Sequence, residues 1–147
     1  MNESAREYFI KGLEFLRRGD ALGALYNFEK SYSLDSTSLL CKSYIALLTA
    51  TERGQMGRSV KTLEEIVAKT PEEPAIYLNL GKLYIRGGKK KEAIEVVRQG
   101  LRQGPLPEAE EFLEKLGTRR TPVFRFLRRD HFLNKYSGLL IKKLGIK

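Results

Sequence analysis

The stretch Gly81–Ile94, GKLYIRGGKKKEAI, holds three glycines and three consecutive lysines, and such residues can cradle a phosphate group. A phosphate-binding loop of a nucleotide enzyme has the form G-x-x-x-x-G-K-[ST] and follows a strand. Counting back five from Gly88 gives Leu83 in place of the first glycine, and Lys90 stands where Ser or Thr would hold magnesium. The preceding residues have helical periodicity. We therefore interpret the paired glycines as a turn between two helices, where glycine adopts positive φ at low cost.

Residues that could act as metal ligands or nucleophiles are sparse. The one histidine, His131, and the one cysteine, Cys41, lie ninety residues apart, so no cluster has the spacing of a metal site. Nothing near His131 in the sequence would orient it as a general base. Three pairs of glutamates fall at expected helix starts or on exposed faces, where they stay solvated: Glu64-Glu65, Glu72-Glu73 and Glu110-Glu111. We expect no catalytic residue, no metal and no cofactor, and hence no enzyme.

The composition is that of one folded domain without a membrane span. Of 147 residues, 41% are hydrophobic and 31% charged, and no run of 18 apolar residues occurs. The N-terminal MNESAREYF lacks the basic and apolar regions of a secretory signal. The single cysteine, Cys41, excludes an internal disulfide and favours a reducing compartment, so we expect a cytoplasmic protein. Its type and apolar setting predict a small core residue rather than a reactive thiol.

The net charge of +9 is concentrated near the C-terminus. Residues 1–117 carry 18 Lys and Arg against 17 Asp and Glu, whereas residues 118–147 carry nine against one. A basic protein is often a partner of nucleic acid or an anionic membrane. In this chain that expectation applies to the last thirty residues.

The body of the chain is predicted to be helical throughout. Apolar residues recur at intervals of three and four, and turn signals rich in Gly, Pro and Asp come about every sixteen residues. No alternating β-branched run indicates a strand. The expected helices are 3–18, 20–34, 37–53, 58–69, 72–86, 89–103 and 107–116, with another near 131–144.

Two segments of the chain repeat each other at an offset of 69 residues. When Tyr8 is aligned with Tyr77, Gly12 meets Gly81 and Gly19 meets Gly88. Ala24 meets Ala93, Phe15 meets Tyr84 and Phe28 meets Val97 in the same register. A weaker middle copy starts near Leu39 and contains one extra residue in its turn. Small residues at the matched positions would let two antiparallel helices approach closely, while the large ones fill the space around them.

With these positions the sequence resembles the tetratricopeptide repeat family, whose period is about 34 residues. The resemblance covers residues 5–106 and is clearest in PAIYLNLGKLYIRGGKKKEAIEVVRQGLRQGP. It implies an all-α, right-handed solenoid of antiparallel helix pairs with a concave groove. The expected domain is 1–117, with repeats at 5–38, 39–73 and 74–106 and a capping helix at 107–117, followed by a basic amphipathic extension at 118–147.

The resemblance also implies which positions line the groove, namely those on the first helix of each repeat. In the first repeat these are Arg6, Phe9, Leu13, Leu16 and Arg17. In the second they are Leu40, Ser43, Leu47 and Ala50, and in the third Ala75, Leu78, Lys82, Ile85 and Arg86. This surface is apolar with a few cations and no carboxylate. It suits a short helix or extended peptide with apolar anchors and an acidic group.

One subset of the family clamps a C-terminal carboxylate with Lys and Asn, and this sequence departs from that motif. Phe9, Leu13, Tyr44 and Ala75 replace clamp residues, and Asn79 takes the place of an arginine. A partner of that kind is therefore disfavoured. The groove could instead be filled by another part of this chain or by a second copy in a homodimer.

The last thirty residues, TRRTPVFRFLRRDHFLNKYSGLLIKKLGIK, leave the repeat pattern. Their apolar stripe could dock on the repeats, or lie on an anionic membrane surface, or the segment could bind RNA through arginines and stacked aromatics. The cations available for a polyanion are Arg119, Arg120, Arg125, Arg128, Arg129, Lys135, Lys142 and Lys143. The sequence thus predicts a protein–protein interaction scaffold or adaptor. The alternative is a binding module whose tail contacts RNA or membrane while the repeats serve as its framework.

Overall fold

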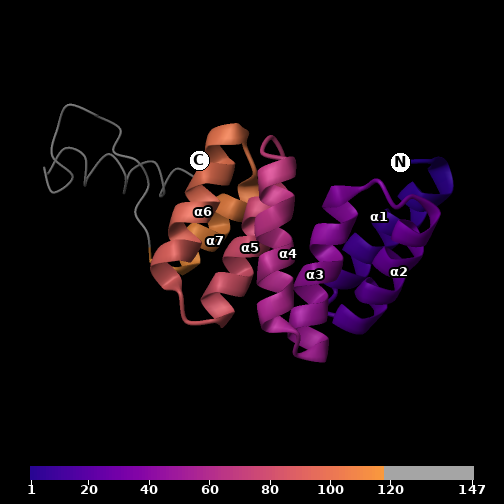
Figure 1. The fold of residues 1–147 in the computed structure, drawn as a ribbon, viewed down its shortest axis with the longest axis horizontal. Coiled ribbons are helices and arrows are strands. Elements are labelled where there is room, and N and C mark those ends of the chain that lie inside the picture. Colours follow the sequence, from indigo (N-terminus) through magenta and orange to yellow (C-terminus); the bar gives the residue numbers. More distant parts are fainter. Residues whose placement is uncertain (118–147) are drawn as a thin grey trace, which may run out of the picture. The chain divides into compact units, whose positions relative to one another are not determined.

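The computed structural model describes residues 1–117, which form seven α-helices and, within those residues, no strand (Figure 1). Their bounds are α1 Glu3–Arg17, α2 Ala21–Leu34, α3 Leu39–Arg53, α4 Met56–Lys69, α5 Pro74–Arg86, α6 Lys90–Gln103 and α7 Pro107–Lys115. The all-α prediction is confirmed, and each of the first seven expected helices is present within two residues of its predicted ends. The helix expected near 131–144 lies outside the described residues.

Capping side chains explain why several helices begin later than predicted. Asp20 and Ser38 are N-caps rather than helical residues, and their side chains accept hydrogen bonds from the backbone N–H groups of Gly23 at 2.8 Å and Cys41 at 3.2 Å. Such a bond satisfies one of the free donors at a helix start. α5 begins at Pro74 because proline suits the first helical position.

A glycine in left-handed conformation ends the first helix of each pair. Gly19, Gly54 and Gly88 have φ values of +83°, +72° and +75°. They are spaced 35 and 34 residues apart, so the turn recurs with a period close to the predicted one. The extra residue expected in the middle turn is not found there, because two residues separate α3 from α4 and three separate the helices of each other pair. The interpretation of Gly87-Gly88 as a turn is confirmed, and the left-handed residue of the two is Gly88.

The helices pack as three successive pairs, α1 with α2, α3 with α4, and α5 with α6. Neighbouring pairs are joined by packing of α2 against α3 and of both α3 and α4 against α5. Figure 1 shows the three pairs side by side in chain order, from α1 and α2 through α3 and α4 to α5 and α6. The first and third pairs pack together more extensively than the middle pair, which agrees with the weaker repeat signal in the sequence of the middle copy.

Small residues at the predicted positions allow the close approach of paired helices. A Cβ on Gly12 of α1 would lie 2.6 Å from the ring of Phe28 in α2. Ala24 and Ala93 are fully buried at their equivalent positions in α2 and α6. In the third pair a Cβ on Gly100 would lie 2.6 Å from the Cβ of Tyr77. The sequence had not indicated this second close approach.

By its contacts the chain divides into two units, Met1–Glu110 and a second beginning at Glu111, so that α7 crosses the boundary. Three full helix pairs and the first turn of α7 thus belong to the first unit. The predicted division of the chain at residue 117 stays a prediction. Among the helices of the described part, none has the length and apolar character needed to cross a membrane.

Candidate functional site

The first helix of each pair carries the predicted groove positions, and α1 presents them most openly. Arg6 and Arg17 are exposed, while Phe9 and Leu13 between them are half-buried. Spacings of three and four residues place these four side chains on one face of α1. Because neither arginine forms an ion pair within the described residues, both guanidinium groups are available to a partner.

Phe9 joins the surface to the core. Its ring lies 5.5 Å from that of Phe28 and 5.8 Å from that of Tyr44, measured between ring centroids. Phe28 and Tyr44 are themselves stacked at 5.0 Å. This aromatic cluster holds α1, α2 and α3 together, and the outer edge of Phe9 remains accessible. Aromatic pairs of this kind add about 0.5–1.5 kcal/mol beyond the burial of their area.

Ile10 is a neighbour of this surface that the sequence reasoning missed. Its side chain is 45% exposed, which is unusual for a large aliphatic residue. The signal was present in the sequence, because Ile10 lies four residues after Arg6 and three before Leu13 and so shares their side of α1. We define the α1 strip as Arg6, Phe9, Ile10, Leu13 and Arg17.

The predicted groove residues of α3 are mostly inside the fold. Ser43, Leu47 and Ala50 are all buried, and Leu40 is half-buried. The Ser43 hydroxyl donates to the carbonyl oxygen of Leu40 at 2.6 Å and accepts a hydrogen bond from Nδ2 of Asn79 at 3.0 Å. These side chains therefore contribute to helix packing, and a partner cannot reach Ser43 or Leu47 without displacing neighbours.

On α5 the same division between buried and open positions recurs. Leu78 is 3% exposed, so it too is a packing residue, whereas Ala75, Lys82 and Ile85 are half-buried and Arg86 is exposed. Of the fourteen predicted groove positions, the structure leaves ten exposed or half-buried. These are Arg6, Phe9, Leu13, Leu16, Arg17, Leu40, Ala75, Lys82, Ile85 and Arg86.

The two junctions between successive first helices use equivalent positions with different chemistry. Phe9 of α1 contacts Tyr44 of α3 through their rings, and Ser43 of α3 contacts Asn79 of α5 through a hydrogen bond. Ser43 stands 34 residues after Phe9, and Asn79 stands 35 after Tyr44. Asn79 is 1% exposed and bound to Ser43, so it does not face a ligand as the corresponding clamp residue would.

Two buried ionisable side chains near the α1 strip stay neutral. Burial, together with the negative charges of Glu108 and Glu73, raises the pKa of Tyr44 to about 12. Burial also raises the pKa of the Cys41 thiol, which donates to the carbonyl oxygen of Phe28 at 3.2 Å. Cys41 is therefore the small core residue that the sequence predicted.

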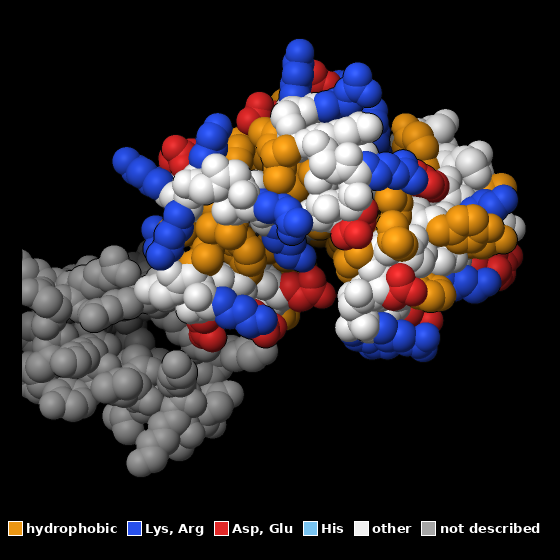
Figure 2. All heavy atoms as spheres, turned by 90° about the horizontal axis from the view of Figure 1, so that it is seen from below, with side chains coloured by type: hydrophobic (Ala, Val, Ile, Leu, Met, Phe, Trp, Pro, Cys, Tyr) orange, Lys and Arg blue, Asp and Glu red, His pale blue; other side chains and the backbone are white. Residues whose placement is uncertain are grey.

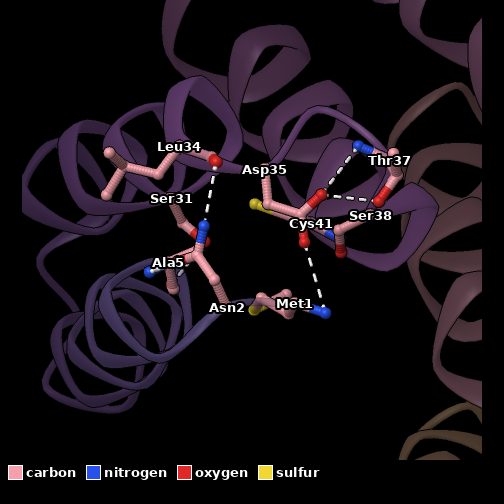
Figure 3. A network of polar contacts seen from close by, with 9 residues as sticks. All are labelled: Met1, Asn2, Ala5, Ser31, Leu34, Asp35, Thr37, Ser38 and Cys41. Carbon is pink, nitrogen blue, oxygen red and sulfur yellow. Dashed lines mark hydrogen bonds and ion pairs between the residues drawn. The ribbon is translucent and has the colours of Figure 1, made fainter.

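A polar network near the N-terminus connects α1 to the turn between α2 and α3 (Figure 3). The Met1 ammonium lies 3.2 Å from a carboxylate oxygen of Asp35, and Asn2 donates to the carbonyl oxygen of Leu34 at 3.1 Å. A hydrogen bond from the Thr37 hydroxyl, assisted by the Thr37 N–H and the ammonium, lowers the pKa of Asp35. Every polar group of this network is bonded within the fold. We therefore interpret the network as a structural link between the start of α1 and the α2–α3 turn, and not as a reactive site.

Within residues 1–117 no group of three or more His, Cys, Asp or Glu side chains could hold a metal ion. His131 lies outside the described residues. The cations proposed for the tail also lie outside them: Arg119, Arg120, Arg125, Arg128, Arg129, Lys135, Lys142 and Lys143. The polyanion role of the tail therefore stays a prediction.

Comparison with known protein families finds a match over part of the chain. Residues 50–116 match a family described as tetratricopeptide repeat. The TPR repeat-containing protein MJ0940 of Methanocaldococcus jannaschii is 29% identical over 94 residues, which are 64% of this chain and 29% of that protein. The chain thus spans less than a third of the length of this curated relative.

Two solved structures of MamA are also similar. One is 20% identical with a TM-score of 0.48 and covers 76% of this chain. The other is 19% identical with the same TM-score and covers 81%. In each case this chain covers 61% of the MamA chain.

Proposed function

We propose that this chain is a non-enzymatic scaffold or adaptor, because residues 50–116 match the tetratricopeptide repeat family, whose fold serves protein–protein interaction. Its partner would be a peptide or helix that docks on the concave side formed by the first helices. The α1 strip, with Lys82 and Arg86 on α5, supplies the contacts. A tail-based role in RNA or membrane binding and a cytoplasmic location remain predictions.

The observation that carries this proposal is the composition of the α1 strip. Three apolar side chains, two of them half-buried and one 45% exposed, lie between two guanidinium groups without ion-pair partners in the described residues. Partly open apolar anchors between cations favour an amphipathic segment with acidic residues at its edges. Figure 2 shows hydrophobic side chains gathered between charged ones on the face that it presents.

Charge also favours an external partner over the chain's own tail. Residues 118–147 contain nine Lys and Arg and a single acidic residue, Asp130. A segment of that charge is a poor electrostatic complement to Arg6, Arg17 and Arg86, since like charges brought together oppose docking. An acidic partner would neutralise these arginines. Homodimerisation through the strip is the competing outcome, and it would appear as a concentration-dependent change in mass.

The test uses peptides selected on the full chain from a random phage-displayed library. We expect the selected peptides to combine apolar and acidic residues. Replacing Phe9 and Leu13 together by Ala should weaken their binding at least about tenfold, or roughly 1.4 kcal/mol, measured by fluorescence anisotropy. The matched control is Leu22→Ala with Tyr26→Ala, which removes apolar surface from two exposed positions on α2.

A second double variant is needed because replacing Phe9 also removes its contacts with two core rings. Arg6→Glu with Arg17→Glu changes exposed side chains only and should weaken the same peptides by a similar factor. Thermal unfolding would verify that this variant remains folded. If both double variants bind the peptides as the unmodified chain does, the strip is not the docking site.

A further inference from the structure

The third repeat differs from the other two in charge. Residues 5–38 contain five Lys and Arg against five Asp and Glu, and residues 39–73 contain the same numbers. Residues 74–106 contain seven Lys and Arg against two Glu. The excess of positive charge in the described residues therefore lies in α5, α6 and the turn between them, and the proposed peptide contacts use only Lys82 and Arg86 of it.

Much of this excess lies along one side of α6. Lys91, Arg98 and Arg102 are exposed, and separations of seven and four residues place them in one row along the helix. None of the three forms an ion pair within the described residues. We call these three residues the α6 row. Glu95 is the one carboxylate on the same side of α6.

The second helices of the other repeats show that the α6 row is not a general property of the fold. At the register of Arg98 the other two helices carry acidic residues, Glu29 in α2 and Glu64 in α4. At the register of Lys91 they carry Leu22 and Gly57, and at that of Arg102 they carry Ser33 and Ala68. The row is therefore specific to the third repeat.

Three further exposed cations extend the basic surface at the N-terminal end of α6, namely Arg86, Lys89 and Lys90. At about 1.5 Å per residue, Lys91 and Arg102 are separated by roughly 16 Å along the helix axis. A nucleic-acid strand in a duplex has a phosphate about every 3.4 Å along its axis, so the row matches about five phosphates. Figure 2 shows Lys and Arg side chains on the side of the molecule where α5 and α6 lie.

The chemistry of α6 favours phosphate contacts over base or lipid contacts. α6 contains no aromatic residue that could stack on a base. Its larger apolar side chains are buried or half-buried, so none is free to enter a bilayer surface. We propose that the α6 row binds the phosphate backbone of double-stranded nucleic acid, without sequence preference and independently of the tail.

The experiment compares two triple variants of the full chain that have the same net charge. Lys91→Glu, Arg98→Glu and Arg102→Glu reverse the α6 row. The control reverses three exposed cations of α4, Arg58→Glu, Lys61→Glu and Lys69→Glu. The probes are fluorescently labelled RNA and DNA duplexes of about 20 base pairs, titrated by anisotropy at several salt concentrations.

We expect the α6 variant to bind either duplex at least about tenfold more weakly, and the α4 variant less than about threefold more weakly. The slope of log K against log salt should become shallower by about three for the α6 variant, one for each lost phosphate contact. Gln in place of Glu at the same three positions should give the same ranking with smaller losses. Far-ultraviolet circular dichroism would verify that each variant is folded.

Three results would overturn the proposal. Equal losses in the α6 and α4 variants would mean that only net charge matters, and no loss in either would assign any binding to other residues such as those of the tail. Binding of phosphatidylserine vesicles that depends on the α6 row, without binding of the duplexes, would assign the row to a membrane surface.

Discussion

Gly12 shows how one missing side chain sets the distance between two helices. A methyl group there would lie 2.6 Å from the Phe28 ring, and Phe28 is fully buried between Phe9 and Tyr44. A shift of this ring would change its contacts with the rings of Phe9 and Tyr44. The repeat register predicted a small residue at this position, and the structure shows which ring requires it.

Replacing Gly12 by Ala should therefore lower the free energy of unfolding by about 1–3 kcal/mol, the usual cost of overpacking a core. The matched change is Gly57→Ala in α4, where an added Cβ meets nothing within 4 Å. That change should raise the stability by about 0.4–1 kcal/mol, because alanine restricts the unfolded chain. Urea titration of both variants measures the difference. Equal effects would show that the close approach to Phe28 is not what matters at position 12.

The sequence was less able to predict which groove positions a partner can reach. Arg6 and Arg17 were correctly expected at the surface, because charged side chains are rarely buried without a partner. Ser43 and Leu78 stand at the register of Phe9, and Leu47 stands at that of Leu13, yet all three are buried. Their burial depends on how closely α3 packs against α5, and a single sequence does not reveal that distance.

At the scale of helices, side-chain capping distinguishes the second helix of the first pair from those of the other two pairs, because neither Gln55 before α4 nor Lys89 before α6 forms a side-chain cap bond. Asp20 caps α2 with its side chain, whereas Gln55 at the start of α4 forms no side-chain cap bond. Only Gly54 and Gln55 separate α3 from α4, whereas three residues separate the helices of each other pair. Our predicted start for α4 came two residues too late, because no capping residue marks it.

The two N-caps give a paired prediction. Asp20→Ala removes the bond to the Gly23 N–H and should cost about 0.5–2 kcal/mol. Gln55→Asp should provide a cap and raise the stability of the chain by up to about 1 kcal/mol. Thermal unfolding would test both. A destabilised Gln55→Asp variant would mean that the backbone at residue 55 cannot place a side-chain oxygen over the first turn of α4.

At the scale of the molecule, helices with more neighbours should open last. α3 packs against α2, α4 and α5, and α5 packs against α3, α4 and α6, whereas α1 packs mainly against α2. In repeat proteins stability is approximately the sum of such neighbour interactions. We therefore expect amides in α3 and α5 to exchange at least about tenfold more slowly than those in α1 and in the first turn of α4.

Native-state hydrogen exchange, followed by mass spectrometry of peptides, would measure this order. Uniform protection across residues 3–103 would contradict it, because it would mean that the helix pairs unfold only as one cooperative block. The measurement would also report on residues 118–147, for which the sequence left docking and free exposure as alternatives.

Most of the fold could be predicted from the sequence because its signals are local and repeated. Gly19, Gly54 and Gly88 mark the turns, and the paired small residues mark the close approaches. The α6 row went unnoticed because its three cations are separated along the sequence and become neighbours only on one side of the helix. Ile10 was missed for a related reason, since an apolar residue in an amphipathic helix is usually assigned to the core.

The two junctions between first helices use different contacts, so the three repeats are not interchangeable in sequence order. Phe9 meets Tyr44 at one junction and Ser43 meets Asn79 at the next. If the gene segment for the middle repeat were duplicated in tandem, Ser43 of one copy would meet Tyr44 of the next, and neither the ring contact nor the hydrogen bond would form there. Copying this unit would therefore create a junction that lacks both of the contacts by which the present first helices meet.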